Sequence, residues 1–317
     1  MRAIDKTAAE AQRRWGSTGP LRLISHRENA VFEASVAGKS AALRLHRPGY
    51  NSVPEIEAEL WWTGKLAEAG FPVPQPILTE DGQQVVRTGD GLVATMVSWV
   101  GGAVLSMEAD GAPDTYRALG GVLARLHDLS DGLDLPDGFT RRSWDIEGLL
   151  GPDPLWGRFW AHPVLTEAET HLLEAARKRV RARMEHFAPE ADFGLIHADA
   201  IRENVLKQGD QLTLIDFDDA GFGFRLYDLA VAISPGFEMG AYPVLKEALV
   251  EGYSANRPIS EASIALLDAF VMLRSFASLG WCAPRIPPDD PGTDRFRRRA
   301  LRAAQAFVDS ETGVDFL

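Results

Sequence analysis

The feature that most constrains this chain is a polar stretch between two short apolar runs in its second half. Phe193–Ile196 reads as a buried strand and ends in a His-x-Asp sequence that closes with Asp199. Asn204 lies five residues beyond Asp199, and the second run, Leu212–Ile215, delivers Asp216 seventeen residues beyond it. Strand ends hold such side chains on a rigid frame, so the order predicts a built polar site.

The residue types in this stretch fit one kind of chemistry. Their order and spacing match the catalytic loop and the metal-binding acid of kinase-type phosphoryl transfer. A carboxylate such as Asp199 can orient an acceptor hydroxyl and take its proton. Mg²⁺ prefers oxygen ligands, which Asn204 and Asp216 supply, beside the phosphates of ATP. The competing interpretation is that these side chains shape a turn and a strand end.

Composition narrows the class of protein further. The 317 residues are 45% hydrophobic and 25% charged, which excludes collagen-like, coiled-coil and disordered chains. A net charge of −12 argues against nucleic acid and anionic membranes as partners. Cys282 has no second cysteine to pair with, and every apolar run is far shorter than a bilayer span of about 20 residues. We expect a cytoplasmic protein, monomer or homodimer, with a small-molecule partner.

The N-terminal third reads as a small sheet with one inserted helix. Alternation of apolar and polar residues predicts strands over residues 21–25, 31–36, 41–45, 84–87 and 92–99. The first three follow one another closely and therefore predict an antiparallel meander. Helical periodicity over residues 55–69 ends at Gly70, before a proline-rich stretch.

The remaining two thirds of the chain is mostly helical. The pattern predicts helices over residues 113–129, 166–187, 226–233, 242–253, 260–281 and 294–308. The tryptophan-rich segment 131–163 is either a lid or acceptor-binding insertion or a packed connector. The arginines of residues 295–302 are expected to pair with nearby carboxylates.

Taken together, these motifs resemble the aminoglycoside phosphotransferase and choline kinase superfamily. Within it the chain looks most like the homoserine kinase type II and bacterial stress-response kinase branch. The resemblance covers essentially the whole chain and adds Leu119–His127 and Leu226–Ala230 to the catalytic stretch. It implies an α+β, bilobal, protein-kinase-like fold, with a nucleotide-binding lobe over residues 1–98 and a catalytic, acceptor-binding lobe over residues 99–317.

The resemblance also implies roles for individual residues. Asp199 would be the catalytic base, and the Mg²⁺ ligands would be Asn204 and Asp216. His197 would be a structural histidine that steadies the loop. Asp228 would fix the loop backbone from behind, although a plain helix N-cap is its alternative.

Asp218 has two possible roles under this resemblance. It would either help to bind a second metal ion or hydrogen-bond the loop, and we favour the loop.

The N-terminal lobe departs from the kinase pattern at its expected lysine. Arg44 stands at that position, and Glu59 on the next helix is its expected partner. Arginine keeps the positive charge but not the geometry of an ammonium. The pair could bind nucleotide phosphates, or it could be purely structural.

A glycine-rich phosphate loop is also missing from the segment 26–30. As the resemblance implies, backbone amides around Asn29 would cover the phosphates. Adenine would lie against the main chain of residues 96–100, which includes Met96 and Ser98.

These observations predict an ATP- and Mg²⁺-dependent phosphotransferase that acts on a hydroxyl of a small metabolite. An amino alcohol, a hydroxy amino acid such as homoserine and an aminoglycoside-like compound are all open as acceptors. One alternative is a protein Ser/Thr kinase of the stress-response type. Another is a catalytically weak nucleotide-binding regulator, suggested by Arg44 and the missing glycines.

Overall fold

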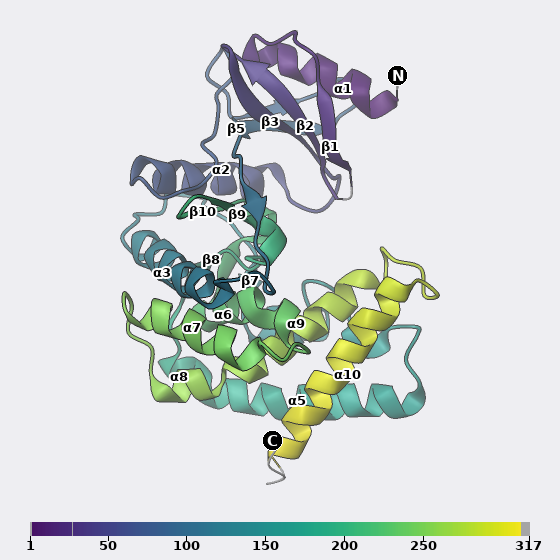
Figure 1. The fold of residues 1–317 in the computed structure, drawn as a ribbon. Helices are drawn as coiled ribbons and strands as arrows, with labels where there is room; N and C mark the ends of the chain where they lie inside the picture. The colour runs from purple at the N-terminus through teal and green to yellow at the C-terminus, as the bar shows by residue number, and fades with distance from the viewer. Residues whose placement is uncertain (1, 27, 312–317) are drawn as a thin grey trace. The chain divides into compact units, whose positions relative to one another are not determined.

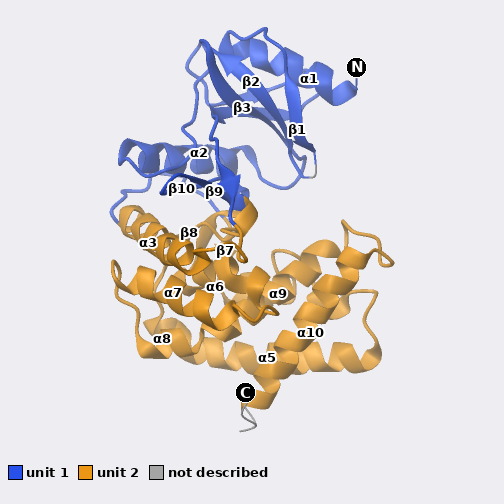
Figure 2. Cartoon of the chain, in the orientation of Figure 1, with its two compact units in different colours: residues 1–105, 132–141, 204–218 blue, residues 106–131, 142–203, 219–317 orange. Residues whose placement is uncertain are grey.

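The computed structural model describes residues 2–26 and 28–311, which form two compact units (Figures 1 and 2). Unit 1 comprises residues 1–105, 132–141 and 204–218, and unit 2 comprises residues 106–131, 142–203 and 219–317. The chain therefore crosses between the units repeatedly, whereas the sequence predicts a single division after residue 98. That predicted lobe boundary stays a prediction.

Unit 1 contains an antiparallel sheet in the strand order β1-β2-β3-β5-β4, as traced over its described residues. The strands are β1 (Arg22–His26), β2 (Ala30–Val36), β3 (Lys39–His46), β4 (Val85–Arg87) and β5 (Val93–Ser98). The register of β2 and β3 sets Val31 opposite Arg44. The predicted meander of the first three strands is confirmed.

Two helices accompany the strands of this sheet, one before β1 and one between β3 and β4. The predicted helix is present as α2 (Val53–Glu68), which begins with a capping box between Ser52 and Glu55. A further helix, α1 (Ala3–Ala11), precedes the sheet, so the expectation of a single helix in this part was incomplete. Ala8 and Ala11 of α1 join the buried core of the sheet. Ile4, Ala8 and Ala11 are spaced as on one face of a helix, but alanine is only weakly apolar, so the signal for α1 is weak.

A hairpin from the second half of the sequence also belongs to unit 1. It consists of β9 (Val205–Gln208) and β10 (Gln211–Leu214), and β6 (Ala103–Val104) pairs with β9. The amide of Leu214 donates to the carbonyl of Pro72 at 3.2 Å. The segment that follows the catalytic stretch is thereby attached to the N-terminal part of the chain.

Unit 2 is mainly helical, which confirms the α+β class. Its helices are α3 (Ala112–Asp131), α4 (Ile146–Leu150), α5 (Glu167–Phe187), α6 (Arg225–Ile233), α7 (Tyr242–Ser254), α8 (Glu261–Ala265), α9 (Leu267–Cys282) and α10 (Pro291–Glu311). The predicted helix 260–281 is broken at Leu266 into α8 and α9, which corrects that expectation. Every residue of α6 is buried. A small sheet in the order β7-β11-β8 joins β7 (Ser143–Trp144), β11 (Gly221–Phe224) and β8 (Phe193–Ile196).

Glycines allow α3 and α7 to approach closely. A Cβ atom on Gly120 would lie 2.1 Å from the carbonyl oxygen of Leu249, and one on Gly252 would lie 1.8 Å from that of Arg117. Larger side chains would force the helices apart. The close approach fixes the part of α3 that ends in the buried His127.

The tryptophan-rich segment 131–163 can be compared with the structure. Trp144 is fully buried and Trp156 is 8% exposed, which favours the packed-connector interpretation of this segment.

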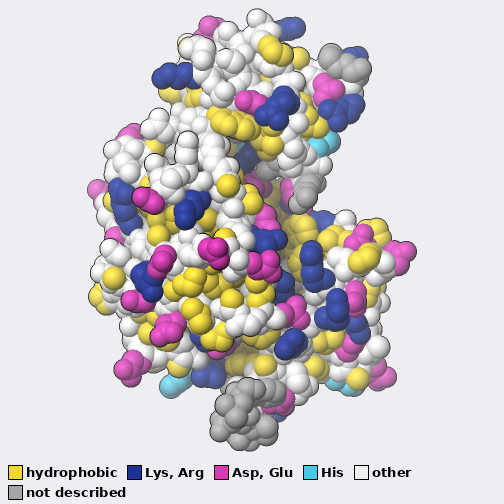
Figure 3. All heavy atoms as spheres, viewed as in Figure 1, with side chains coloured by type: hydrophobic (Ala, Val, Ile, Leu, Met, Phe, Trp, Pro, Cys, Tyr) yellow, Lys and Arg dark blue, Asp and Glu magenta, His cyan; other side chains and the backbone are white. Residues whose placement is uncertain are grey.

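The arginines of residues 295–302 lie on α10. Arg297 pairs with Glu169 and Asp294, so the expected pairing with carboxylates is confirmed. Acidic and basic side chains are interspersed on the visible face of unit 2 (Figure 3). Across residues 2–26 and 28–311, the helices are too short or too polar to cross a bilayer.

Candidate active site

The catalytic loop predicted from the sequence follows β8 in unit 2. Asp228, a fully buried residue of α6, accepts hydrogen bonds from the amides of His197 at 2.8 Å and Ala198 at 2.7 Å. These contacts suit the role that the resemblance gives to Asp228. They hold the loop backbone just before Asp199.

A buried network extends behind Asp228. His127 Nε2 lies 3.1 Å from Asp228 Oδ2, and His127 Nδ1 lies 2.8 Å from the hydroxyl of Tyr253. Burial opposes the charged form of Asp228, but the bond from His127 keeps the pKa of Asp228 below its usual range. Burial also lowers the pKa of His127, although Asp228 acts in the opposite direction. The network therefore combines an ionised acid with a neutral histidine at pH 7.

The loop presents Asp199 from a constrained backbone. Ala198 has φ of +62°, a left-handed conformation that costs a non-glycine residue about 1 to 3 kcal/mol. The amide of Asp199 donates to Nδ1 of the fully buried His197 at 3.2 Å, a contact that suits the structural role predicted for this histidine. The Asp199 side chain is 17% exposed, which leaves it accessible from solvent.

Arg274 of α9 contacts this loop, although the two segments lie far apart in the sequence. Arg274 Nη2 donates to Asp199 Oδ1 at 2.5 Å, and Nη1 lies 3.4 Å from the carbonyl oxygen of Ala198. The guanidinium carbon stacks 4.5 Å from the ring centre of Trp156. A usable signal was present, because Arg274 is a lone charge within the apolar run Phe270–Ala277.

The predicted metal ligands belong to unit 1, at the open end of the β9–β10 hairpin. Val205 pairs with Leu214 there, and the amide of Ile215 donates to the carbonyl of Asn204 at 3.0 Å. Asn204 and Asp216 therefore flank the same end of the hairpin. Asp216 has φ of +64°, a second strained backbone at a predicted site residue.

This ligand set is compatible with Mg²⁺. Across the described residues, no group of three or more His, Cys, Asp or Glu side chains is arranged to hold a metal ion by itself. Mg²⁺ is commonly bound by one or two carboxylates together with substrate phosphates and water. The carboxylate of Asp216 and the amide oxygen of Asn204 suit that kind of site.

Arg44 of β3 lies at the centre of a cluster of acids in unit 1. Its guanidinium is 3.3 Å from Glu59, 3.0 Å from Asp216 and 3.7 Å from Asp218. Burial alone would lower the pKa of Arg44, but these carboxylates raise it, so the arginine stays charged. Burial raises the pKa of Glu59 to about 7 against the pull of Arg44, whose charge Glu59 shares with the other acids.

The contacts of Asp218 with Asn51 and Arg44 lie within unit 1, so its two predicted roles, loop support and second metal site, stay predictions. Asn51 Nδ2 donates to both the carbonyl and the Oδ1 of Asp218, each at 3.0 Å. Arg141 donates to the carbonyls of Phe217 and Asp218, each at 2.9 Å. Arg141 and Asn51 were not among the predicted site residues, and no local motif marks them.

The predicted nucleotide contacts are distributed over the same unit. Asn29 Oδ1 accepts from the amide of Arg47 at 2.9 Å, which joins the residue before β2 to the residue after β3. The carbonyl of Met96 accepts from Ile77, and the amide of Ser98 donates to Gln75, each at 2.8 Å. These two main-chain groups are thus engaged within the protein, and the adenine contact stays a prediction.

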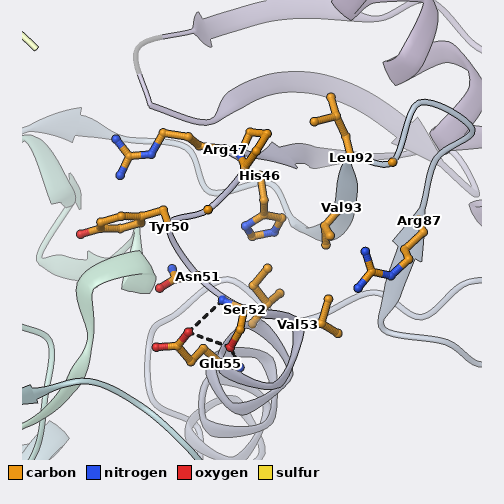
Figure 4. A pocket seen from close by; sticks show the side chains of 14 residues that line it. His46, Arg47, Tyr50, Asn51, Ser52, Val53, Glu55, Arg87, Leu92 and Val93 are labelled. Carbon is orange, nitrogen blue, oxygen red and sulfur yellow. Dashed lines mark hydrogen bonds between the residues drawn. The ribbon is translucent and has the colours of Figure 1, made fainter.

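A cavity of about 490 Å³ in unit 1 lies apart from these predicted residues, none of which lines it. Figure 4 shows Arg47 and Tyr50 on one side of it and Arg87 on the other. His46 borders the cavity, and its Nδ1 lies 4.0 Å from Asp218 Oδ1. Burial, followed by the charge of Arg44, lowers the pKa of His46 to about 3.

The chain is similar to known phosphotransferases in sequence and in fold. Residues 20–264 match the phosphotransferase enzyme family. The homoserine kinase of Agrobacterium fabrum is 32% identical over 210 residues, which are 64% of this chain and 60% of that kinase. The alignment thus spans less than two thirds of that relative.

Solved structures agree with the sequence comparison. A microcompartment-associated aminopropanol kinase has a TM-score of 0.86 and 29% identity, with 98% of each chain covered. An amicoumacin kinase in complex with AMP-PNP, Ca²⁺ and Ami has a TM-score of 0.76 and 19% identity, with 92% of this chain and 88% of that chain covered. The fold is therefore protein-kinase-like, as predicted, and the chain belongs to the phosphotransferase enzyme family, whose members are kinases that act on hydroxyl groups.

Proposed function

We propose that this protein transfers the γ-phosphate of ATP, with Mg²⁺, to the hydroxyl of a small amino alcohol or hydroxy amino acid. The observation that carries the proposal is the paired support of Asp199, which is held by His197 through its amide and by Arg274 through its carboxylate. A turn residue would not need such support. The relatives that act on small hydroxyl compounds supply the reaction class.

Asp199 acts on the acceptor in this proposal. Its carboxylate accepts a hydrogen bond from the acceptor hydroxyl, which orients the oxygen for attack, and takes the proton as the bond to phosphorus forms. Such positioning supplies much of the rate in phosphoryl transfer. The hydrogen bonds from the loop to Asp228 keep the base from shifting.

Unit 1 acts on the nucleotide. Asn204 and Asp216 would hold Mg²⁺, which neutralises charge on the β- and γ-phosphates. Arg44 is the cation beside Asp216 and would exchange part of its carboxylate contacts for phosphate oxygens. Asp199 belongs to unit 2 and Asn204 to unit 1, but they are only five residues apart along the chain, so one loop carries a proposed site residue of each unit.

The acceptor class rests on the relatives. Two of the relatives are named after homoserine and aminopropanol, and both compounds carry an amino group and a hydroxyl group. We therefore place the acceptor among small compounds with both groups. An aminoglycoside is the less favoured class.

An ADP-release screen tests the proposal. The purified chain with ATP and Mg²⁺ is incubated with 1-amino-2-propanol, ethanolamine, L-homoserine, choline and an aminoglycoside. We expect release to be stimulated by a small amino alcohol or by homoserine. Release without preference for any of them, or labelling of mixed protein by radiolabelled ATP instead, would contradict the proposal.

The matched variant is Asp199→Asn, which keeps size and polarity. We expect kcat to fall by about 10² to 10⁴ while the circular dichroism spectrum is unchanged, because the amide cannot take the proton. The control is Asp153→Asn, an acid in unit 2 whose side chain is 81% exposed. Normal turnover by Asp199→Asn would remove Asp199 from the role of base.

A further inference from the structure

Arg274 is a buried charge whose position in an apolar helix calls for a reason. It is 6% exposed on α9, where Leu273 and Ser275 beside it are also buried. Removing a guanidinium from water costs several kcal/mol unless charged and polar partners compensate for it. A helix that needed packing alone would be better served here by an apolar residue.

The compensation that Arg274 receives comes from the catalytic loop. Its hydrogen bond to Asp199 joins two opposite charges at 2.5 Å, and such charge-assisted bonds are roughly twice as strong as neutral ones. Trp156 supports the guanidinium from its face, which limits the motion of the planar group. The partners thus point the arginine at Asp199.

We propose that Arg274 is a positioning residue of the transfer reaction, which holds and orients the carboxylate of Asp199 for the acceptor hydroxyl. The proposal rests on the proposed function, because it assumes that Asp199 is the base. An arginine partner makes a carboxylate a weaker base. That cost is offset because a carboxylate held in one orientation positions the acceptor hydroxyl, and positioning supplies much of the rate in phosphoryl transfer.

Two other buried side chains near Asp199, His197 and Tyr227, do not hold its carboxylate as Arg274 does. His197 is fully buried and contacts the amide of Asp199 rather than its carboxylate. Tyr227 is also fully buried, and burial raises its pKa to about 12, so it stays neutral at pH 7. Of Arg274, His197 and Tyr227, it is Arg274 that brings a full positive charge to the carboxylate of Asp199.

The first test needs no acceptor. Carbon-13 NMR follows the carboxyl group of Asp199, assigned by its disappearance in Asp199→Asn, in the full chain and in Arg274→Gln. We expect the apparent pKa of Asp199 to rise by about one unit or more in Arg274→Gln. The matched control is Arg177→Gln, because Arg177 also stacks on a tryptophan, Trp160, and donates to the carbonyl oxygen of Leu150. An unchanged pKa in Arg274→Gln overturns the proposal.

The second test is kinetic and uses the acceptor that gives the most ADP release. We expect kcat to fall about tenfold to a hundredfold in Arg274→Gln, with KM for ATP unchanged and partial recovery in Arg274→Lys. In an Asp199→Asn background, Arg274→Gln should have no further effect on kcat. Equal losses in both backgrounds would show a merely structural role.

The two proposals can fail separately. Normal activity of Asp199→Asn would end the proposed function, whereas an inactive Asp199→Asn with normal Arg274→Gln would end the role of Arg274 and leave the function standing. A variant that does not fold is recognised by its circular dichroism spectrum, and Arg274→Lys then takes its place in both tests.

Discussion

The two units differ in how their buried charged side chains are paired. In unit 2, Asp228 is fully buried and its oxygens accept from two loop amides and contact His127. In unit 1, Arg44 is surrounded by competing carboxylates, and the side chain of Asp216 is 45% exposed. Asp228 has fixed, saturated partners, whereas Arg44 divides its donors among several acids.

The difference separates a scaffold from a site that can exchange partners. A saturated buried acid cannot be replaced without leaving donors unpaired, so it holds one backbone geometry. A guanidinium shared among acids can turn toward phosphate at little cost. The comparison therefore predicts large structural effects for changes around Asp228 and smaller ones for conservative changes at Arg44.

The largest effect is expected for Asp228→Ala. The substitution leaves the amides of His197 and Ala198 without their acceptor and removes the partner of His127. Loss of one member of such a buried charged network costs about 3 to 5 kcal/mol. Urea unfolding followed by circular dichroism measures the change in the free energy of unfolding.

Two variants bracket that prediction. Asp228→Asn keeps an acceptor oxygen and should cost less than the alanine variant. Asp153→Ala removes an exposed acid that pairs with Arg158 at the surface, and it should cost under about 1 kcal/mol. A loss for Asp228→Ala no larger than that of Asp153→Ala would contradict the scaffold role.

A medium effect is expected from the titration of His46 in unit 1. Its pKa of about 3 lies below the ordinary value of 6.5, so the unfolded chain binds the proton more readily. The contribution of His46 to stability is therefore complete above about pH 6.5 and is lost as pH falls toward 3. Between pH 7.5 and pH 5 the loss amounts to about 2 kcal/mol.

The measurement compares the chain with His46→Gln, in which the amide can still meet Thr95, the partner of His46 Nε2 at 2.9 Å. We expect the variant to lose less unfolding free energy than the original chain between pH 7.5 and pH 5. The difference between the two slopes removes the contributions of His127 and Glu59. Parallel pH profiles would show that His46 is not held neutral.

Local patterns in the sequence predict part of the structure of both units. Strand alternation predicts the meander that carries Arg44, and the spacing after β8 predicts Asp199, Asn204 and Asp216 as a set. Asp228 follows from the family resemblance. In each case the signal lies within a few residues or in a known order along the chain.

The parts that the sequence does not predict depend on contacts between distant segments. Arg274 reaches Asp199 across 75 residues, and Arg141 reaches the carbonyl of Phe217 across 76. Neither distance leaves a periodic trace. The left-handed backbone of Ala198 is also hidden, because alanine gives no sign of positive φ, and although aspartate adopts this conformation more often, its residue type alone does not single out Asp216.

The smallest effect is expected for Arg44→Lys. Arginine reaches Glu59 through Nη1 and Asp216 through Nη2, and a single ammonium cannot copy both contacts. The charge remains, so we expect a loss of about 1 kcal/mol in the free energy of unfolding and retained turnover. Arg22→Lys is the control, since Arg22 pairs with Glu33 at the exposed edge of the same sheet. A loss in Arg44→Lys as large as that in Asp228→Ala would mean that the Arg44 cluster is as rigid as the scaffold in unit 2, and the proposed exchange of its carboxylate contacts for phosphate would then fail.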